Sequence, residues 1–142
     1  MGAGKTFIGK KLASELNLPF FDLDKELEKL SQLTITQMFE KLGEPFFRQM
    51  ESGLLLNWNK NGVMATGGGI VENKQNREFL RKKENICIWL NPAWETIKER
   101  INGSFRPLVK NLSSDELKQL WQKRLSFYKE CADIEIKSKK TN

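Results

Sequence analysis

Histidine is absent from this 142-residue sequence, and cysteine is scarce. Without an imidazole group, catalysis by a histidine base is excluded, and a common zinc ligand is missing. Cys87 and Cys131 lie far apart in the sequence and form no C-x-x-C pair, so a structural zinc site is disfavoured as well. Two unpaired cysteines are typical of a reducing compartment, and we therefore expect a cytoplasmic protein.

The sequence also lacks a long apolar run. No segment approaches the roughly 20 residues needed to span a bilayer, and no basic-then-apolar secretion signal stands at its start, so we expect no membrane contact. With 39% hydrophobic and 30% charged residues, the composition is that of a globular protein. The length predicts one domain over residues 1–142 with a real core, and we expect it to act as a monomer.

Positive charge exceeds negative charge, and the net charge is +6. Nucleic-acid binding is one interpretation, but the sequence has no basic stretch interleaved with aromatic residues, of the kind on which bases stack. We favour solvated helix faces together with a few arginines gathered around a small anionic substrate. We therefore expect no nucleic-acid partner.

The opening hexapeptide is the back half of a phosphate-binding P-loop, whose full pattern is G-x-x-x-x-G-K-[ST]. In such a loop, backbone N–H groups surround the phosphates, the lysine reaches the β- and γ-phosphates, and the hydroxyl ligates Mg²⁺. The sequence therefore predicts a site for a nucleotide, ATP with Mg²⁺, at five residues: Gly2, Ala3, Gly4, Lys5 and Thr6.

An amphipathic helix is predicted directly after this loop, because Ile8, Leu12 and Leu16 recur at i, i+4 and i+8. The loop would deliver phosphates to a helix N-terminus, where anions are favoured; the alternative is a plain glycine-rich turn. A buried strand precedes loops of this kind, and here the first motif glycine would lie one residue before Met1. We therefore expect either a fragment that begins inside the P-loop or a start placed at an internal methionine.

Short apolar runs alternate with helical patterns, which predicts an α/β fold of three layers, a parallel sheet between helices. Strands are expected at residues 18–24, 62–66, 86–90 and 134–136, with a fifth implied before the P-loop. Helices are expected at residues 7–16, 25–33, 34–43, 47–58, 74–83, 91–103 and 113–128, with Thr34 and Ser113 as N-caps and Asn91-Pro92 as a helix start. Residues 104–113 show no periodicity and are predicted to form a loop.

Asp22 and Asp24 lie at the carboxyl end of the first expected strand, the edge at which ligands bind in open α/β sheets. Residues two apart in a strand point to the same side. One carboxylate could hold Mg²⁺ or its waters, and the other could orient a substrate hydroxyl and accept its proton. The alternative is that Asp24 is a helix N-cap.

Three consecutive glycines, Gly67, Gly68 and Gly69, follow the second expected strand. Because glycine costs backbone entropy, the usual reason for such a run is close approach of main-chain N–H groups to a ligand. A tight turn is the alternative.

Three arginines are candidates for anion binding. Arg48 lies near a helix start, with Glu51 one turn later as an orienting partner, and Arg124 lies among apolar neighbours on a long helix. Two converging arginines would suit a carboxylate, since a guanidinium pairs with it bidentately. Arg106 is in the expected loop, where a mobile arginine could close over a transferring phosphoryl group.

Taken in order, six segments of the sequence resemble shikimate kinase: Gly2–Thr6, Phe21–Asp24, Gly43–Glu51, Ala65–Gly69, Arg106–Leu108 and Arg124–Tyr128. The resemblance covers nearly the whole chain, although the first strand of that family and its adenine loop and terminal helix are missing at the two ends. It implies a P-loop kinase of the nucleoside-monophosphate-kinase type with a five-stranded parallel sheet. Such an enzyme phosphorylates the 3-hydroxyl of shikimate from MgATP in aromatic amino-acid biosynthesis.

The resemblance also implies roles for the residues that bind the substrate. Asp24 and the Gly68 N–H, within Gly67–Gly69, would engage hydroxyl groups of shikimate. Arg48 and Arg124 would take its carboxylate.

On the nucleotide side, the resemblance implies that Lys5 and Thr6 hold phosphates and Mg²⁺, with Asp22 assisting the metal through water. Arg106 would be the lid arginine, in a lid of about residues 104–113, and Arg100 would stack on adenine.

Two alternatives to this function remain open. One is another small-molecule kinase on the same fold, such as a gluconate kinase, from which the combination of Gly67–Gly69 with Arg48 and Arg124 distinguishes the sequence. The other is an inactive remnant that binds nucleotide or a partner protein.

Overall fold

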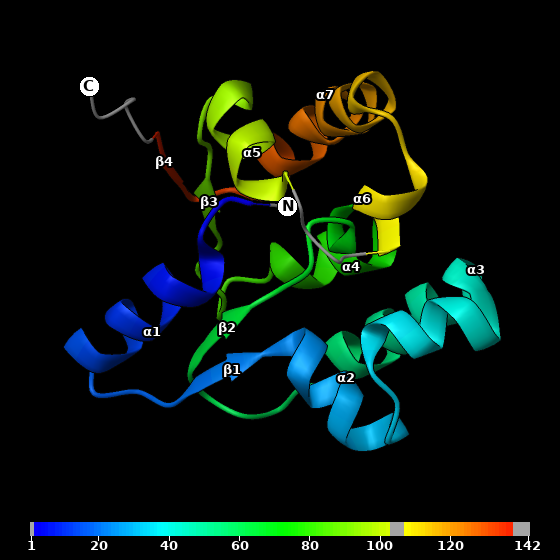
Figure 1. Cartoon of the computed structure of the whole chain (residues 1–142). Helices are drawn as coiled ribbons and strands as arrows, with labels where there is room; N and C mark the ends of the chain where they lie inside the picture. Colours follow the sequence, from blue (N-terminus) through cyan, green and yellow to red (C-terminus); the bar gives the residue numbers. More distant parts are fainter. Residues whose placement is uncertain (1, 103–106, 138–142) are drawn as a thin grey trace. The chain divides into compact units, whose positions relative to one another are not determined.

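The computed structural model describes residues 2–102 and 107–137 of the chain (Figure 1). Its elements follow in the order α1 (Lys5–Glu15), β1 (Phe20–Asp22), α2 (Leu23–Ser31), α3 (Ile35–Leu56), β2 (Val63–Ala65), the 3-10 helix η1 (Ile70–Glu72), α4 (Lys74–Leu80), β3 (Ile88–Leu90), α5 (Trp94–Ile101), α6 (Pro107–Asn111), α7 (Ser114–Cys131) and β4 (Ile134–Ile136). The predicted alternation of strands and helices is confirmed.

The chain divides into two compact units, which are described separately. The N-terminal unit is Gly4–Ile70, and the C-terminal unit is Met1–Ala3 together with Val71–Asn142. Within the described residues, each unit contains one parallel strand pair, β1 with β2 and β3 with β4. The prediction of parallel strands is therefore confirmed.

In the N-terminal unit, Phe20 of β1 is opposite Val63 of β2, and Asp22 is opposite Ala65. Because parallel strands end at the same edge, this register brings Asp22 and the residues that follow Ala65 to one place. Figure 1 shows the two strands side by side, with α2 continuing directly from β1.

The core of the N-terminal unit lies where α2 packs on α3, around the buried side chains of Leu27, Met38 and Phe47. The rings of Phe39 and Phe47 are 4.7 Å apart between centroids, a favourable aromatic separation. Since Arg48 follows Phe47, this core fixes the position of the arginine's backbone.

The buried face of α1 differs from the prediction. Gly9 and Ala13 are its buried residues, whereas Ile8 and Leu16 are exposed. The reason is close packing against β1: a Cβ on Gly9 would lie 2.6 Å from Cε2 of Phe20. Small residues at this contact let α1 approach the strand, which an apolar periodicity does not reveal.

Several predicted helix boundaries are confirmed by their capping contacts. Thr34 and Ser113 both form complete capping boxes, with Gln37 and Glu116 as their partners. Gly43, where the third helix was expected to stop, has φ of 80° and interrupts α3. The chain then resumes helical conformation as far as Leu56, and this second segment carries Arg48.

Three boundary predictions are wrong. The first strand ends at Asp22, so Asp24 lies in the first turn of α2 instead of on a strand. Helix α5 is capped by Ala93 and begins two residues after Pro92. Pro107–Asn111, within the segment predicted as a loop, forms the short helix α6, for which five residues offer too little periodicity to detect.

In the C-terminal unit, α5 and α7 share a core of Trp94, Ile97, Ile101 and Leu117. Trp121 packs on this cluster, and its ring lies 5.5 Å from that of Trp94. The packing orients α7, so that Arg124, two turns after Leu117, is buried.

Among the described residues, no helix combines the length and the apolar character needed to cross a membrane.

Both cysteines are free thiols, and their protonation gives a test of this unit. Burial, with smaller contributions from Cys131 and Asp133, raises the pKa of Cys87 to about 11, and burial also raises the pKa of Cys131. At pH 8 only about one thousandth of Cys87 would be thiolate, the species that reacts. We expect iodoacetamide to label the folded chain at least about tenfold more slowly than the chain in urea.

The pH dependence has a definite sign. Because folding makes deprotonation harder, the labelling rate of the folded chain should keep rising with pH beyond 9, where that of the unfolded chain levels off. Equal rates for the folded and unfolded chains, measured by mass spectrometry, would contradict the burial of these thiols.

Candidate active site

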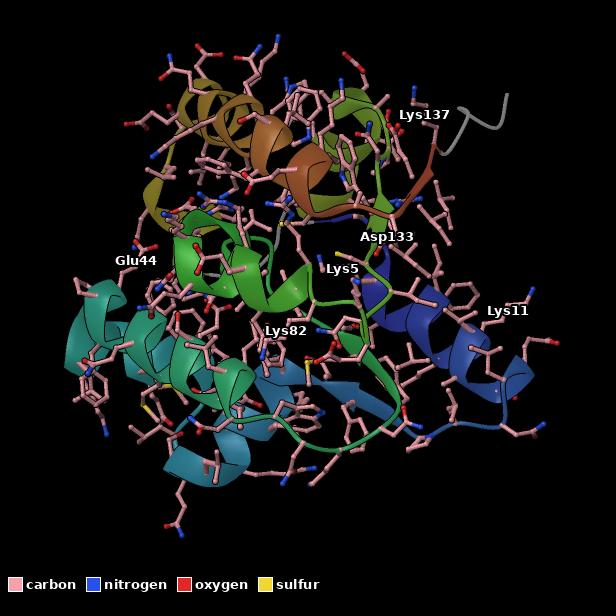
Figure 2. The ribbon with its side chains drawn as sticks, turned by 180° about the vertical axis from the view of Figure 1, so that it is seen from behind. Lys5, Lys11, Glu44, Lys82, Asp133 and Lys137 are labelled. Carbon is pink, nitrogen blue, oxygen red and sulfur yellow. The ribbon has the colours of Figure 1, made fainter. Side chains whose placement is uncertain are left out.

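The P-loop segment has the backbone conformation that its glycines allow. Gly2 and Gly4 have φ of 63° and 84°, in the left-handed region that residues with a side chain rarely adopt. Gly4 is the N-cap of α1, and Lys5 is the first residue of that helix (Figure 2). The eleven-residue helix therefore directs its N-terminal N–H groups, and the positive end of its dipole, to the place predicted for phosphates.

Thr6 and Asp22 join the start of α1 to the end of β1. Thr6 Oγ1 donates a hydrogen bond of 3.0 Å to Asp22 Oδ2. A hydroxyl and a carboxylate oxygen at this separation fit Mg²⁺, which takes few ligands from protein when phosphates and water complete its shell. Among the described residues, no cluster of three or more His, Cys, Asp or Glu could hold a metal ion alone, so phosphate oxygens would be needed.

Asp22 and Asp24 have different local roles from those the sequence suggested. Asp22 is the N-cap of α2, and its Oδ1 accepts a 3.2 Å hydrogen bond from the Asp24 backbone N–H. Asp24 is therefore not the cap, and that alternative is wrong. The Asp24 carboxylate instead lies beside the glycine segment, with Oδ1 3.7 Å from the position of a Cβ on Gly67.

Arg48 is held by two carboxylates on its own helix. Its Nη1 donates to Glu51 Oε2 at 2.8 Å, and its Nε and Nη2 contact Glu44 Oε1 at 3.3 and 3.2 Å. Glu51 is 1% exposed, whereas Glu44 is partly exposed. The predicted orienting role of Glu51 is confirmed, and Glu44 is a partner that sequence reasoning missed, although its i,i+4 spacing indicates it.

These carboxylates also decide the charge of Arg48. Burial alone would lower the pKa of Arg48, but attraction to Glu51, and then to Glu44, outweighs burial, and the pKa is raised. The guanidinium group therefore stays positively charged.

The glycine segment makes room for these side chains. A Cβ on Gly69 would lie 2.5 Å from Cζ, Nη1 and Nη2 of Arg48, and one on Gly67 would lie 2.6 Å from Glu51 Oε1. The glycines therefore admit protein side chains at close range, and the approach of their main-chain N–H groups to a ligand stays a prediction. Gly67, Gly69, Asp24, Arg48 and Glu51 consequently form one constellation in the N-terminal unit.

Arg124 and Arg100 belong to the C-terminal unit. Arg124 is 2% exposed, and its Nε contacts Glu72 Oε1 at 2.6 Å. Arg100, which was predicted to stack on adenine, donates from Nη1 to the carbonyl oxygen of Gly2, a residue of the same unit, at 3.1 Å. Arg106 lies outside the described residues, and Glu72 was not identified from the sequence.

Figure 2 labels Lys5 and Glu44 and shows which helix carries each of them. Lys5 lies at the beginning of α1, and Glu44 lies in α3 just beyond the break at Gly43. Within the N-terminal unit, the phosphate-side residues are therefore carried by the start of α1 and the end of β1, and the Arg48 constellation by the second part of α3.

Comparison with known proteins gives a consistent result. The family model described as shikimate kinase matches residues 1–142. A shikimate kinase of Macrococcus caseolyticus is 42% identical over 138 residues, which cover 96% of this chain and 82% of that protein. A bifunctional shikimate kinase/3-dehydroquinate synthase of Thermotoga maritima is 37% identical over 137 residues, but the match spans 27% of its length.

Solved structures agree with the sequence matches. The structure of a shikimate kinase from Acinetobacter baumannii, in complex with shikimate, superposes with a TM-score of 0.86 at 33% identity. The match covers 99% of this chain and 80% of that one. The shikimate kinase of Aquifex aeolicus matches with a TM-score of 0.79 at 36% identity, over 96% of this chain and 80% of that one.

Substitution of Gly69 tests the constellation. In Gly69→Ala the new methyl group would overlap the guanidinium of Arg48, which must leave Glu51 or push the backbone aside. We expect a loss of about 1–3 kcal/mol in the free energy of unfolding, measured with urea.

Gly53→Ala is the matched control, because a Cβ there meets nothing within 4 Å and the residue is helical. It should stabilise the protein by up to about 1 kcal/mol. Equal stability of Gly69→Ala and the parent chain would show that Arg48 does not occupy this position.

Proposed function

We propose that this chain, which belongs to the shikimate kinase family, transfers the γ-phosphoryl group of ATP to the 3-hydroxyl of shikimate, giving shikimate 3-phosphate and ADP. The reaction places the protein in chorismate and aromatic amino-acid biosynthesis. We expect residues 1–142 to act as one kinase domain, monomeric and in the cytoplasm.

The phosphates of ATP bind at Gly2–Thr6. The left-handed glycines and the N-terminus of α1 support this assignment, since both direct N–H groups toward an anion. Lys5 adds a positive charge that stabilises the transferring group. Arg100 is assigned to the adenine side, and Arg106 to the lid over the phosphates.

Thr6 and Asp22 would hold Mg²⁺, as their 3.0 Å contact suggests. When bound, the ion neutralises charge on the β- and γ-phosphates. The protein side chains supply the rest of the chemistry.

Shikimate offers a carboxylate and hydroxyl groups. Arg48 binds the carboxylate, and its pairing with buried Glu51 fixes the orientation of the guanidinium group. Arg124 is assigned to the same carboxylate, and the Gly68 N–H to a hydroxyl group.

Asp24 acts on the 3-hydroxyl. As the hydroxyl oxygen forms a bond to the γ-phosphorus, the bond from that phosphorus to the bridging oxygen of ADP breaks. The hydroxyl proton passes to the Asp24 carboxylate. The observation that carries this assignment is the constellation in which Asp24 and Arg48 both adjoin Gly67–Gly69.

The activity is tested by ADP release, coupled to NADH oxidation, with shikimate, gluconate or a nucleoside monophosphate as acceptor. We expect shikimate alone to stimulate ATP consumption, because a nucleoside monophosphate lacks the carboxylate and the open chain of gluconate does not hold its hydroxyl groups at fixed ring positions. Turnover of gluconate as fast as shikimate would instead favour a gluconate-type kinase.

The same assay tests the P-loop. Lys5→Met should lower kcat by at least about two orders of magnitude, since a preorganised charge at the transferring phosphoryl group is lost. An unchanged kcat in Lys5→Met would remove the P-loop assignment.

Arg48→Lys tests the carboxylate assignment. An ammonium group keeps the charge but cannot form the bidentate pair, so we expect the KM for shikimate to rise roughly ten- to hundredfold. The KM for ATP should change by less than about twofold, because the substitution leaves the P-loop intact. A normal KM for shikimate in this variant would show that Arg48 does not bind the carboxylate.

A further inference from the structure

Among the described residues of the C-terminal unit, Glu72 is the charged partner of Arg124. Its Oε1 lies 2.6 Å from Arg124 Nε. The side chain of Arg124 is 3% exposed and that of Glu72 is 31% exposed, so the arginine is buried and its carboxylate partner is partly exposed. Within the part of the chain that the structure describes, this ion pair uses Nε, at the inner edge of the guanidinium, and leaves the two Nη groups at its tip for a ligand.

The backbone that carries Glu72 is tied to α7 by a second set of contacts. Arg77 Nη1 donates to the carbonyl oxygens of Val71 and Glu72, at 2.8 and 3.2 Å. The same guanidinium stacks on Phe127 at 4.4 Å and pairs with Glu130 at 3.0 Å, and both of these residues belong to α7. Glu72 is therefore fixed relative to the helix that carries Arg124.

From these contacts we propose that Glu72 is a positioning residue for substrate binding. It holds Arg124 by its Nε edge, so that the Nη edge can form a bidentate pair with the substrate carboxylate. The inference rests on the proposed function, because it requires that Arg124 binds this carboxylate. Glu72 itself does not touch the substrate.

The physical reason is the cost of a buried charge. An arginine without its partner in a buried position is unfavourable and turns toward water or another acceptor. Without Glu72, the Arg124 side chain would therefore turn away from the orientation that binds the substrate carboxylate.

The test compares steady-state kinetics of Glu72→Ala, Arg124→Ala, the double variant and Glu78→Ala. We expect Glu72→Ala to raise the KM for shikimate about tenfold, the effect of losing one oriented pair, with kcat and the KM for ATP within about twofold. In the Arg124→Ala background, Glu72→Ala should add nothing, because a residue that acts through another has no effect in its absence. Glu78→Ala is the matched control, since it breaks an exposed ion pair of the same unit, that with Lys74, and leaves the contacts of Glu72, Arg77 and Arg124 intact.

Two further variants keep the test decisive if Glu72→Ala does not fold. Glu72→Gln retains an acceptor for Nε and should raise the KM for shikimate less than Glu72→Ala or Glu72→Asp, whose carboxylate is withdrawn by one methylene group. A normal KM for shikimate in Glu72→Asp and Glu72→Ala, when Arg124→Ala raises it, would overturn the inference alone. Additive effects of Glu72→Ala and Arg124→Ala would overturn it too. A normal KM in Arg124→Ala would instead show that the proposed carboxylate role of Arg124 is wrong, and the inference would fall with it.

Discussion

The ion pair between Arg48 and Glu51 is the interaction on which the candidate site depends. Glu51 is almost wholly buried, so its charge has given up water and must be compensated within the protein. Arg48 supplies that compensation at 2.8 Å and in return acquires a fixed orientation. Loss of either partner would leave an unpaired charge in a poorly solvated place. Because desolvation of the two charges offsets much of their attraction, the main effect of the pair is to fix the orientation of the Arg48 guanidinium.

The elements around this pair follow from it. The break at Gly43 lets the second part of α3 begin with its own first turn, where Pro45 is tolerated because no intrahelical donor is lost. Phe47 packs into the core of α2 and α3, and the neighbouring Arg48 then faces the glycine segment. Gly67 and Gly69 accept the two side chains because they have none of their own.

Local sequence signals predicted the parts of the fold that depend on local chemistry. Ser113 was identified as a cap from its four-residue capping box with Glu116, Thr34 from the preference of threonine for the N-cap, and Gly43 as a helix end because glycine allows positive φ. The face of α1 was wrong because its packing depends on Phe20, which lies outside the helix. The end of the first strand was predicted two residues late, at Asp24 instead of Asp22. A three-residue strand followed directly by a capped helix is too short to show a strand periodicity. The pairing of Arg124 with Glu72 joins residues far apart in the sequence, so no spacing rule could indicate it.

The two oxygens of Asp22 serve two helices at once. Oδ2 accepts from Thr6 in the first turn of α1, and Oδ1 accepts from the amide of Asp24 at the start of α2. A ligand that binds one oxygen of Asp22 therefore changes the strength of the helix cap made by the other oxygen. By thermodynamic reciprocity, a change in the cap alters the affinity for the ligand by the same factor. Ligand binding at the P-loop would thus change the rate of amide hydrogen exchange in the first turn of α2. In the same way, a substitution that frays the start of α2 would weaken nucleotide binding although the substituted residue does not contact the phosphates.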